Sequence, residues 1–284
     1  GLPGSAIYRY DGDPSSLTRF DTDPRSLPFA VSGDAPDDVM IIGAAGGNEV
    51  LASLYYDTGH VDAIELNPVT YDLVAHRFAD YAGNIAQDPR VNYVNGDGRS
   101  FLARSDDEFD IVWFPAPDSY AATNAASSGA FVLSESYLYT QEAVEDSLDH
   151  LGGDGILAAQ FGEFDYENKP NRTTRYVATA REALAARGID DPIRNIMVAT
   201  TPAVGFGTQL STILVKETPF TPDEIDRFIA GLEPIEGATL RYAPGHPVDG
   251  EPVSDLITAQ GDEVESFFAD YPYQVDAITD NGPF

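Results

Sequence analysis

The sequence contains no cysteine and only two lysines, Lys169 and Lys216. The absence of cysteine excludes disulfides, thiolate metal sites and a cysteine nucleophile. The four histidines are scattered, with no pair at the spacing of metal ligands, so we expect no metal site. No apolar run approaches the roughly 18 residues that a membrane-spanning helix needs, so we predict no such helix within this sequence.

Basic residues are scarce beside acidic ones. Asp and Glu number 47 against 16 Lys and Arg, which gives a formal net charge of -31. Nucleic-acid binding is disfavoured, because phosphate contacts need basic patches. The acids are spread along the chain, so we interpret them as a solvated, halophilic surface suited to high salt. Attraction of a cationic substrate is a second interpretation, and it is compatible with the first.

Strand and helix patterns alternate from residue 38 onward. This alternation predicts an α/β fold with a doubly wound, mostly parallel, Rossmann-like sheet of seven strands, and the last two strands predict an antiparallel edge. We expect three parts. Residues 1–37 form a small N-terminal hairpin or lid, residues 38–217 form the ligand-binding domain, and residues 218–284 form a C-terminal helical appendage.

The stretch "VMIIGAAGGNEVLASL" (39–54) reads as a strand, a tight glycine turn and a helix. Gly43, Gly46 and Gly47 can adopt backbone angles that other residues avoid, and they let a ligand approach the main chain. The G-A-A-G-G spacing matches the dinucleotide fingerprint poorly. No lysine follows the turn, so a Walker-type phosphate loop is excluded. A plain structural turn without a ligand stays open at this point.

Two acids follow the next two predicted strands. Glu65 ends the second strand, where a carboxylate can accept hydrogen bonds from both ribose hydroxyls. Asp97 follows the third strand, where it can accept from an amino group such as N6 of adenine. Each alone is more often a surface acid. Together with the glycine turn they outline an adenosine site without a phosphate-binding lysine, which points to S-adenosylmethionine or a relative.

With these residues in place, the chain resembles the spermidine synthase family of aminopropyltransferases, over about residues 38–217. The resemblance is carried by "VMIIGAAGGNEVL", "VDAIELNP", "DPRVNYVNGDGRSFL", "FDIVWFPAPDS", "SESYLYTQEAV" and "LGGDGILAAQ". "SESYLYT" and the closing "ITDNGPF" resemble members fused to multi-helix membrane proteins in bacteria and archaea. This implies a cytoplasmic domain that is related to, or cut from, a membrane protein.

The resemblance implies the methyltransferase-type fold of class I S-adenosylmethionine-dependent enzymes. It also implies S-adenosylmethionine or its decarboxylated form as donor, a small amine as acceptor, and a homodimer. The expected donor-site residues are Gly43, Ala45, Gly46, Gly47, Glu65, Leu66, Asp97, Gly98 and Pro115. Asp118 and Glu135 are the expected catalytic acids, which position the amine and accept its proton. Tyr120 and Tyr137 are expected to line the substrate pocket, and residues 121–130 to form a closing loop.

The sequence departs from the family at the acceptor side. The family places acids where this chain has Gly46 and Pro115, and a tyrosine near Val204. Asp118 matches a family acid, although a turn residue is an equally plausible role for it. Three functions stay open: alkyl (aminopropyl) transfer to an amine, methylation of a small molecule, and a non-catalytic adenosine-binding domain of a membrane protein.

Overall fold

A mostly parallel sheet forms the centre of the computed structural model, which describes residues 6–115, 137–202 and 209–282. In these residues the sheet has eight strands in the order β3-β2-β1-β4-β5-β7-β6-β8. The first five of that order run parallel, and β7, β6 and β8 pair antiparallel to their neighbours. The strands are β1 (Asp38–Ile42), β2 (His60–Glu65), β3 (Val91–Asn95), β4 (Phe109–Pro115), β5 (Leu151–Glu163), β6 (Ile196–Pro202), β7 (Gln209–Val215) and β8 (Thr239–Tyr242).

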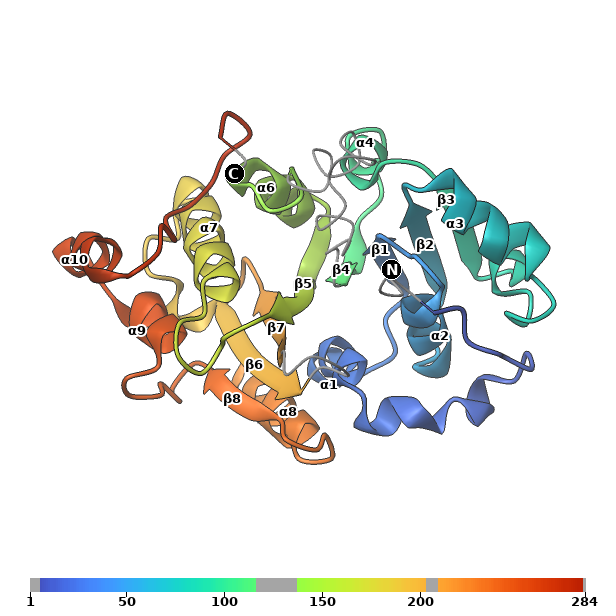
Figure 1. Cartoon of the computed structure of the whole chain (residues 1–284), viewed down its shortest axis with the longest axis horizontal. Helices are drawn as coiled ribbons and strands as arrows, with labels where there is room; N and C mark the ends of the chain where they lie inside the picture. Colours follow the sequence, from blue (N-terminus) through green and yellow to red (C-terminus); the bar gives the residue numbers. More distant parts are fainter. Residues whose placement is uncertain (1–5, 116–136, 203–208, 283–284) are drawn as a thin grey trace.

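Helices cover both faces of this sheet, which confirms the doubly wound α/β prediction (Figure 1). The α-helices are α1 (Leu27–Ser32), α2 (Asn48–Tyr55), α3 (Pro68–Asp72), α4 (Gly98–Leu102), α6 (Gln141–Asp149), α7 (Arg172–Ala186), α8 (Pro222–Leu232), α9 (Pro252–Thr258) and α10 (Asp262–Asp270). Shorter helical turns are η1 (Pro14–Ser16), η2 (Thr18–Thr22), η3 (Pro24–Ser26), η4 (Leu73–Arg77), η5 (Ile85–Gln87) and η7 (Pro192–Arg194).

The core is split by the sheet into two layers. Alternate residues of β1 point to opposite faces, so Val39 and Ile41 pack with α1, α2 and α8, while Met40 and Ile42 pack with α6, α7 and α9. Trp113 is fully buried in the first layer, edge-on to Phe29, so it belongs to the core.

The predicted N-terminal hairpin is wrong. Residues 6–37 contain η1, η2, η3 and α1, with no strand in this range. Asp13 and Asp23 each precede a proline, and each side chain caps the following turn by accepting a backbone N–H bond. Proline fixes φ and lacks the N–H that a sheet ladder needs, so these Asp-Pro pairs start short helices instead.

The predicted strand number is also wrong, because the structure has an eighth strand. β8 lies within residues 218–284, the segment predicted to be a helical appendage, and it pairs with β6. It has only four residues and precedes a stretch rich in Pro and Gly, so its periodicity is too short to identify. The segment's helices α8, α9 and α10 are present as well.

Candidate functional site

The candidate site lies at one edge of the sheet. Strands β1, β2, β3 and β4 are parallel, so their carboxyl ends meet at this edge. The residues that follow these ends are the glycine turn after β1, Glu65 at the end of β2, and Asp97 after β3. Pro115 ends β4, buried and paired with Gln160 of β5.

The turn after β1 is built from left-handed residues. Gly43, Ala45 and Gly47 have φ values of 93°, 45° and 82°. A Cβ on Gly47 would lie 2.3 Å from the terminal Cδ1 of Ile85, so a larger residue would have to displace this side chain and also adopt a left-handed backbone angle. A Cβ on Gly43 would meet no described atom within 4 Å, so none of the described residues fills the space directly in front of it.

Glu65 joins β2 to this turn. Its carboxylate accepts hydrogen bonds from the backbone N–H of Ala45 and of Asn67, each at 2.7 Å. The side chain is buried, yet a carboxylate offers about four acceptor positions. Glu65 therefore holds the turn after β1 to the end of β2.

Tyr93 of β3 was not predicted and completes the support of the turn. Its hydroxyl donates to the carbonyl of Ala45 at 2.8 Å, so both backbone polar groups of this left-handed residue are held by side chains. Burial raises the pKa of Tyr93 well above its usual value, and the nearby Glu65 charge raises it further. Tyr93 therefore stays a neutral donor. In the sequence, Tyr93 is marked only by the alternation of "VNYVN", which predicts that its side chain points to the same face of the strand as Val91.

Asp97 is the N-cap of α4. Its Oδ1 accepts from the backbone N–H of Ser100 at 2.8 Å, and the side chain is half-buried. Gly98 is pressed against the end of β1, because a Cβ there would lie 2.5 Å from Ile42. Leu66 is half-buried, and its carbonyl accepts a long hydrogen bond from the Asn95 side chain at 3.3 Å.

The N-terminal segment packs on the helix that follows the turn. Arg25 forms a partly buried ion pair with Glu49 in the first turn of α2, with Nε 2.6 Å from Oε1. Arg19 donates to the side chain of Asn48, the first residue of α2, and its guanidinium lies over the ring of Phe20. These two arginines were not predicted, because their partners are far away in the sequence.

The predicted acceptor side falls largely outside the described residues. Asp118, Tyr120 and Glu135 all lie in the range 116–136, and Val204 lies in 203–208. Tyr137 is described and exposed, and its carbonyl accepts from Arg99 at 3.2 Å.

The described part of the chain holds no group of three or more His, Asp or Glu side chains placed to bind a metal ion. In the same residues, no helix is long and apolar enough to cross a membrane.

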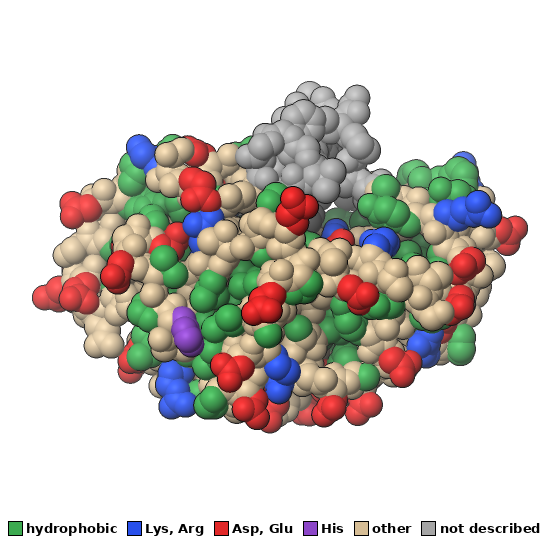
Figure 2. Space-filling model, turned by 90° about the horizontal axis from the view of Figure 1, so that it is seen from below, with side chains coloured by type: hydrophobic (Ala, Val, Ile, Leu, Met, Phe, Trp, Pro, Cys, Tyr) green, Lys and Arg blue, Asp and Glu red, His purple; other side chains and the backbone are tan. Residues whose placement is uncertain are grey.

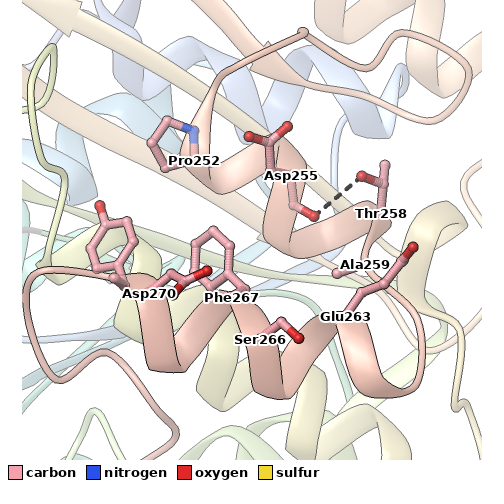
Figure 3. Close-up of a pocket in the computed structure, with 9 residues that line it drawn as sticks. Pro252, Asp255, Thr258, Ala259, Glu263, Ser266, Phe267 and Asp270 are labelled. Atoms are coloured by element: carbon pink, nitrogen blue, oxygen red, sulfur yellow. Dashed lines mark hydrogen bonds between the residues drawn. The ribbon is translucent and has the colours of Figure 1, made fainter.

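A hollow lies between α9 and α10, away from the candidate site, and is shown in Figure 3. It is lined by Asp255, Glu263, Asp270 and the ring of Phe267, among others. Helices α9 and α10 lie at the opposite end of the molecule from β3 (Figure 1), so this hollow is separate from the strand-end site.

The sheet order, the glycine turn after β1 and the acid at the end of β2 define a class I S-adenosylmethionine-dependent transferase fold. The family model described as the spermine/spermidine synthase domain matches residues 28–185. The chain belongs to this family.

Two curated proteins are similar to this chain over part of their length. A polyamine aminopropyltransferase of Streptococcus uberis is 28% identical over 184 residues, which cover 64% of this chain and 56% of the relative. One of Streptococcus pneumoniae is 28% identical over 150 residues, covering 52% of this chain and 48% of the relative. The chain thus spans about half the length of these curated relatives.

Among solved structures, a probable spermidine synthase from Corynebacterium glutamicum superposes with a TM-score of 0.52. It is 14% identical, and the match covers 86% of this chain and 73% of that one. At this identity the likeness concerns the fold, and it agrees with the sheet described above.

Proposed function

We propose that this chain transfers an aminopropyl or related alkyl group from decarboxylated S-adenosylmethionine or S-adenosylmethionine to a small amine. The observation that carries the proposal is the turn at Gly43–Gly47 braced by Glu65, in a chain of the spermine/spermidine synthase family. Relatives named polyamine aminopropyltransferase support an amine acceptor.

The proposed donor site uses residues that the structure describes. The space in front of Gly43 admits the nucleoside close to the backbone. Glu65 accepts from the ribose hydroxyls, and Asp97 accepts from the adenine amino group. The donor carries its alkyl group on a positively charged sulfonium, and no metal is required.

The proposed reaction is a displacement at carbon. A neutral amine nitrogen forms a bond to the alkyl carbon while the carbon–sulfur bond breaks, and that electron pair returns to sulfur as a neutral thioether. The new ammonium loses a proton to a carboxylate, which we assign to Asp118, with Glu135 anchoring the amine. Much of the rate then comes from aligning nitrogen, carbon and sulfur.

Methyl transfer is a second candidate, favoured by Gly46 and Pro115. These residues stand where the resembled family has acids, so the groups that would face a diamine or an aminopropyl chain differ here. Tyr120 and Tyr137 would line the altered acceptor pocket in either case.

Calorimetry against S-adenosylmethionine, its decarboxylated form and methylthioadenosine tests the donor site, and product analysis with a panel of amines tests the chemistry. We expect micromolar to millimolar binding of at least one nucleoside and an alkylated amine as product. Binding of none of the three would contradict the proposal. Unchanged turnover in Asp118→Asn would contradict the assignment of the base.

A further inference from the structure

Two stretches noted in the sequence, "SESYLYT" and "ITDNGPF", have described residues, 137–140 and 278–282, that meet in the structure although they are far apart in the chain. The tail after α10 runs back to the start of α6, as Figure 1 shows in red and green. There the hydroxyl of Thr140, the N-cap of α6, donates to Asp280 Oδ1 at 2.7 Å. The carboxylate of Asp280 therefore joins the tail to the start of α6 through a specific hydrogen bond.

Backbone contacts fix the tail on α6. The backbone N–H of Gln141 donates to the carbonyl of Ile278 at 2.8 Å. The backbone N–H of Asp280 donates to Glu142 Oε2 at 2.9 Å. The tail is thus held on α6 at several points, so the position of Asp280 relative to α6 is fixed.

Arg99 of α4 connects this centre to the candidate site. Its Nη1 donates to both oxygens of Asp280, at 2.8 and 3.0 Å. Its Nε and Nη2 donate to Asp146 Oδ2 of α6, at 2.9 and 2.7 Å. A planar guanidinium bound by two carboxylates has a fixed orientation, which a lysine could not reproduce.

The pKa shifts of Arg99 and Asp280 are consistent with the hydrogen bonds between them. Burial alone would lower the pKa of Arg99, but its hydrogen bonds to Asp280 and Asp146 raise it above the usual value. Burial alone would raise the pKa of Asp280, but the bonds from Arg99 and Thr140 lower it. Both partners are therefore charged at neutral pH.

Arg99 follows Asp97 by two residues. Gly98, between them, is pressed against Ile42 at the end of β1. Arg99 is held by Asp146 of α6 and Asp280 of the tail, and it lines a small cavity together with Ile42 and Phe114. The two residues that follow Asp97 are therefore both fixed by tertiary contacts, which restrict the position of the Asp97 carboxylate.

We propose that Arg99 and Asp280 are positioning residues for nucleoside binding. The C-terminal tail orients Arg99, Arg99 fixes α4, and α4 places Asp97 for the adenine amino group. This inference rests on the proposed function, because it assumes that Asp97 meets the nucleoside.

The test compares Asp280→Asn with Asp276→Asn in the full chain. Asp280→Asn keeps the shape of the side chain and removes its charge. Asp276 lies on the same tail, is exposed, and forms no ion pair in the described structure, so its variant is a matched control. Calorimetric titration with methylthioadenosine and thermal melting are measured for both variants and for the unmodified protein.

We expect Asp280→Asn to weaken methylthioadenosine binding about tenfold, the size of losing one positioning contact, and Asp276→Asn to leave it unchanged. Asp280→Glu, which keeps the charge, should recover part of the affinity. In turnover assays the KM for the donor should rise while the KM for the amine stays constant, a split that general destabilisation would not produce.

The possible outcomes distinguish a failure of the proposed function from a failure of this inference. If the unmodified protein binds no nucleoside, the proposed function fails and this inference falls with it. If it binds and a folded Asp280→Asn binds equally well, this inference alone is overturned. Should Asp280→Asn fail to fold, Arg99→Lys provides the second variant, since it keeps the charge and loses the planar fork. Affinity equal to the unmodified protein in a folded Arg99→Lys would overturn the proposal.

Discussion

Glu65 illustrates how one side chain can serve the fold and a ligand together. Its two oxygens each accept a backbone N–H bond, from Ala45 and from Asn67, and these bonds hold the turn after β1 to the end of β2. A neutral amide at this position would have one acceptor oxygen and an unwanted pair of donors. Loss of the carboxylate should therefore disturb both the turn and the ribose contact that we propose.

We predict that Glu65→Gln weakens binding of methylthioadenosine by at least about tenfold, since hydrogen bonds to a charged acceptor contribute roughly 1.5–3 kcal/mol. Isothermal titration calorimetry measures the change. Glu108→Gln is the control, because Glu108 is exposed and directly precedes β4, at the other end of that strand from the candidate site. Equal affinities for the two variants would contradict the role given to Glu65.

Substitutions of two glycines in the turn should distinguish an effect on stability from an effect on nucleoside binding. We predict that Gly47→Ala lowers the free energy of unfolding by about 2–4 kcal/mol, because it adds a left-handed alanine and a clash with Ile85. Gly43→Ala should lower it by only about 1–2 kcal/mol, from backbone strain alone. Its larger effect should be on nucleoside binding, because the new methyl group would occupy the space in front of the turn that we assign to the nucleoside.

Urea unfolding and calorimetry on the same two variants give both quantities. Gly153→Ala is a control for the loss of a glycine, because its φ is not positive and a Cβ there meets no described atom. If Gly43→Ala left binding intact while Gly47→Ala left stability intact, the reading of both positions would be wrong.

At the scale of elements, the sequence was most informative where patterns are long. The buried strands "DVMIIG" and "FDIVWF" and the helix after Gly47 lie where periodicity predicts them. The short elements were missed, because Asp13 and Asp23 form local caps and β8 has only four residues. Contacts between distant residues, such as Arg99 with Asp280, leave no local pattern and could not be predicted.

Helix α8 provides a test at this scale. A capping box at its start joins Thr221 and Glu224, and Glu224 Oε1 also lies 2.6 Å from the ammonium of Lys216, which directly follows β7. Lys216 is almost completely buried. Burial alone would raise the pKa of Glu224, but the bonds from Lys216 and Thr221 lower it below its usual value of 4.5.

A lowered pKa in the folded state means that the charged carboxylate stabilises the fold above the unfolded pKa of about 4.5, and that this stabilisation is lost as pH falls through the folded value. We predict that Glu224→Gln costs about 2 kcal/mol at pH 7, because Lys216 loses its buried partner and keeps only the exposed carboxylate of Asp154, 3.2 Å away. The difference from the unmodified protein should shrink below about pH 4.5.

Urea unfolding at a series of pH values measures this difference. Glu233→Gln is the control, because Glu233 is exposed at the other end of α8. A difference between Glu224→Gln and the unmodified protein that stayed constant down to pH 3 would show that Glu224 does not titrate as proposed.

At the scale of the whole molecule, the charge dominates. Acidic side chains are scattered over the face shown in Figure 2. Even if all 16 basic residues were paired with acids, the formal net charge of -31 would remain, so repulsion between carboxylates outweighs attraction. Arg187, for example, is held between Asp149 and Glu217, two acids for one base.

Salt should therefore stabilise this protein rather than weaken it. The Debye length falls from about 10 Å at 0.1 M to about 3 Å at 1 M, which screens repulsion between exposed acids more than it weakens buried pairs such as Lys216–Glu224. We predict that the melting temperature rises by about 5 °C or more between 0.1 and 2 M KCl, which corresponds to roughly 2 kcal/mol for a chain of this size.

A variant with fewer surface charges separates screening from other effects of salt. Asp106, Asp226 and Glu236 are exposed and have no ion-pair partner in the described part of the chain. Changing them together to Asn, Asn and Gln should raise the melting temperature at low salt and reduce its dependence on KCl, because less repulsion is left to screen. A melting temperature that stayed flat or fell with KCl in the unmodified protein would contradict the halophilic interpretation. An equal rise in both proteins would assign the effect to salt acting on burial rather than on charge.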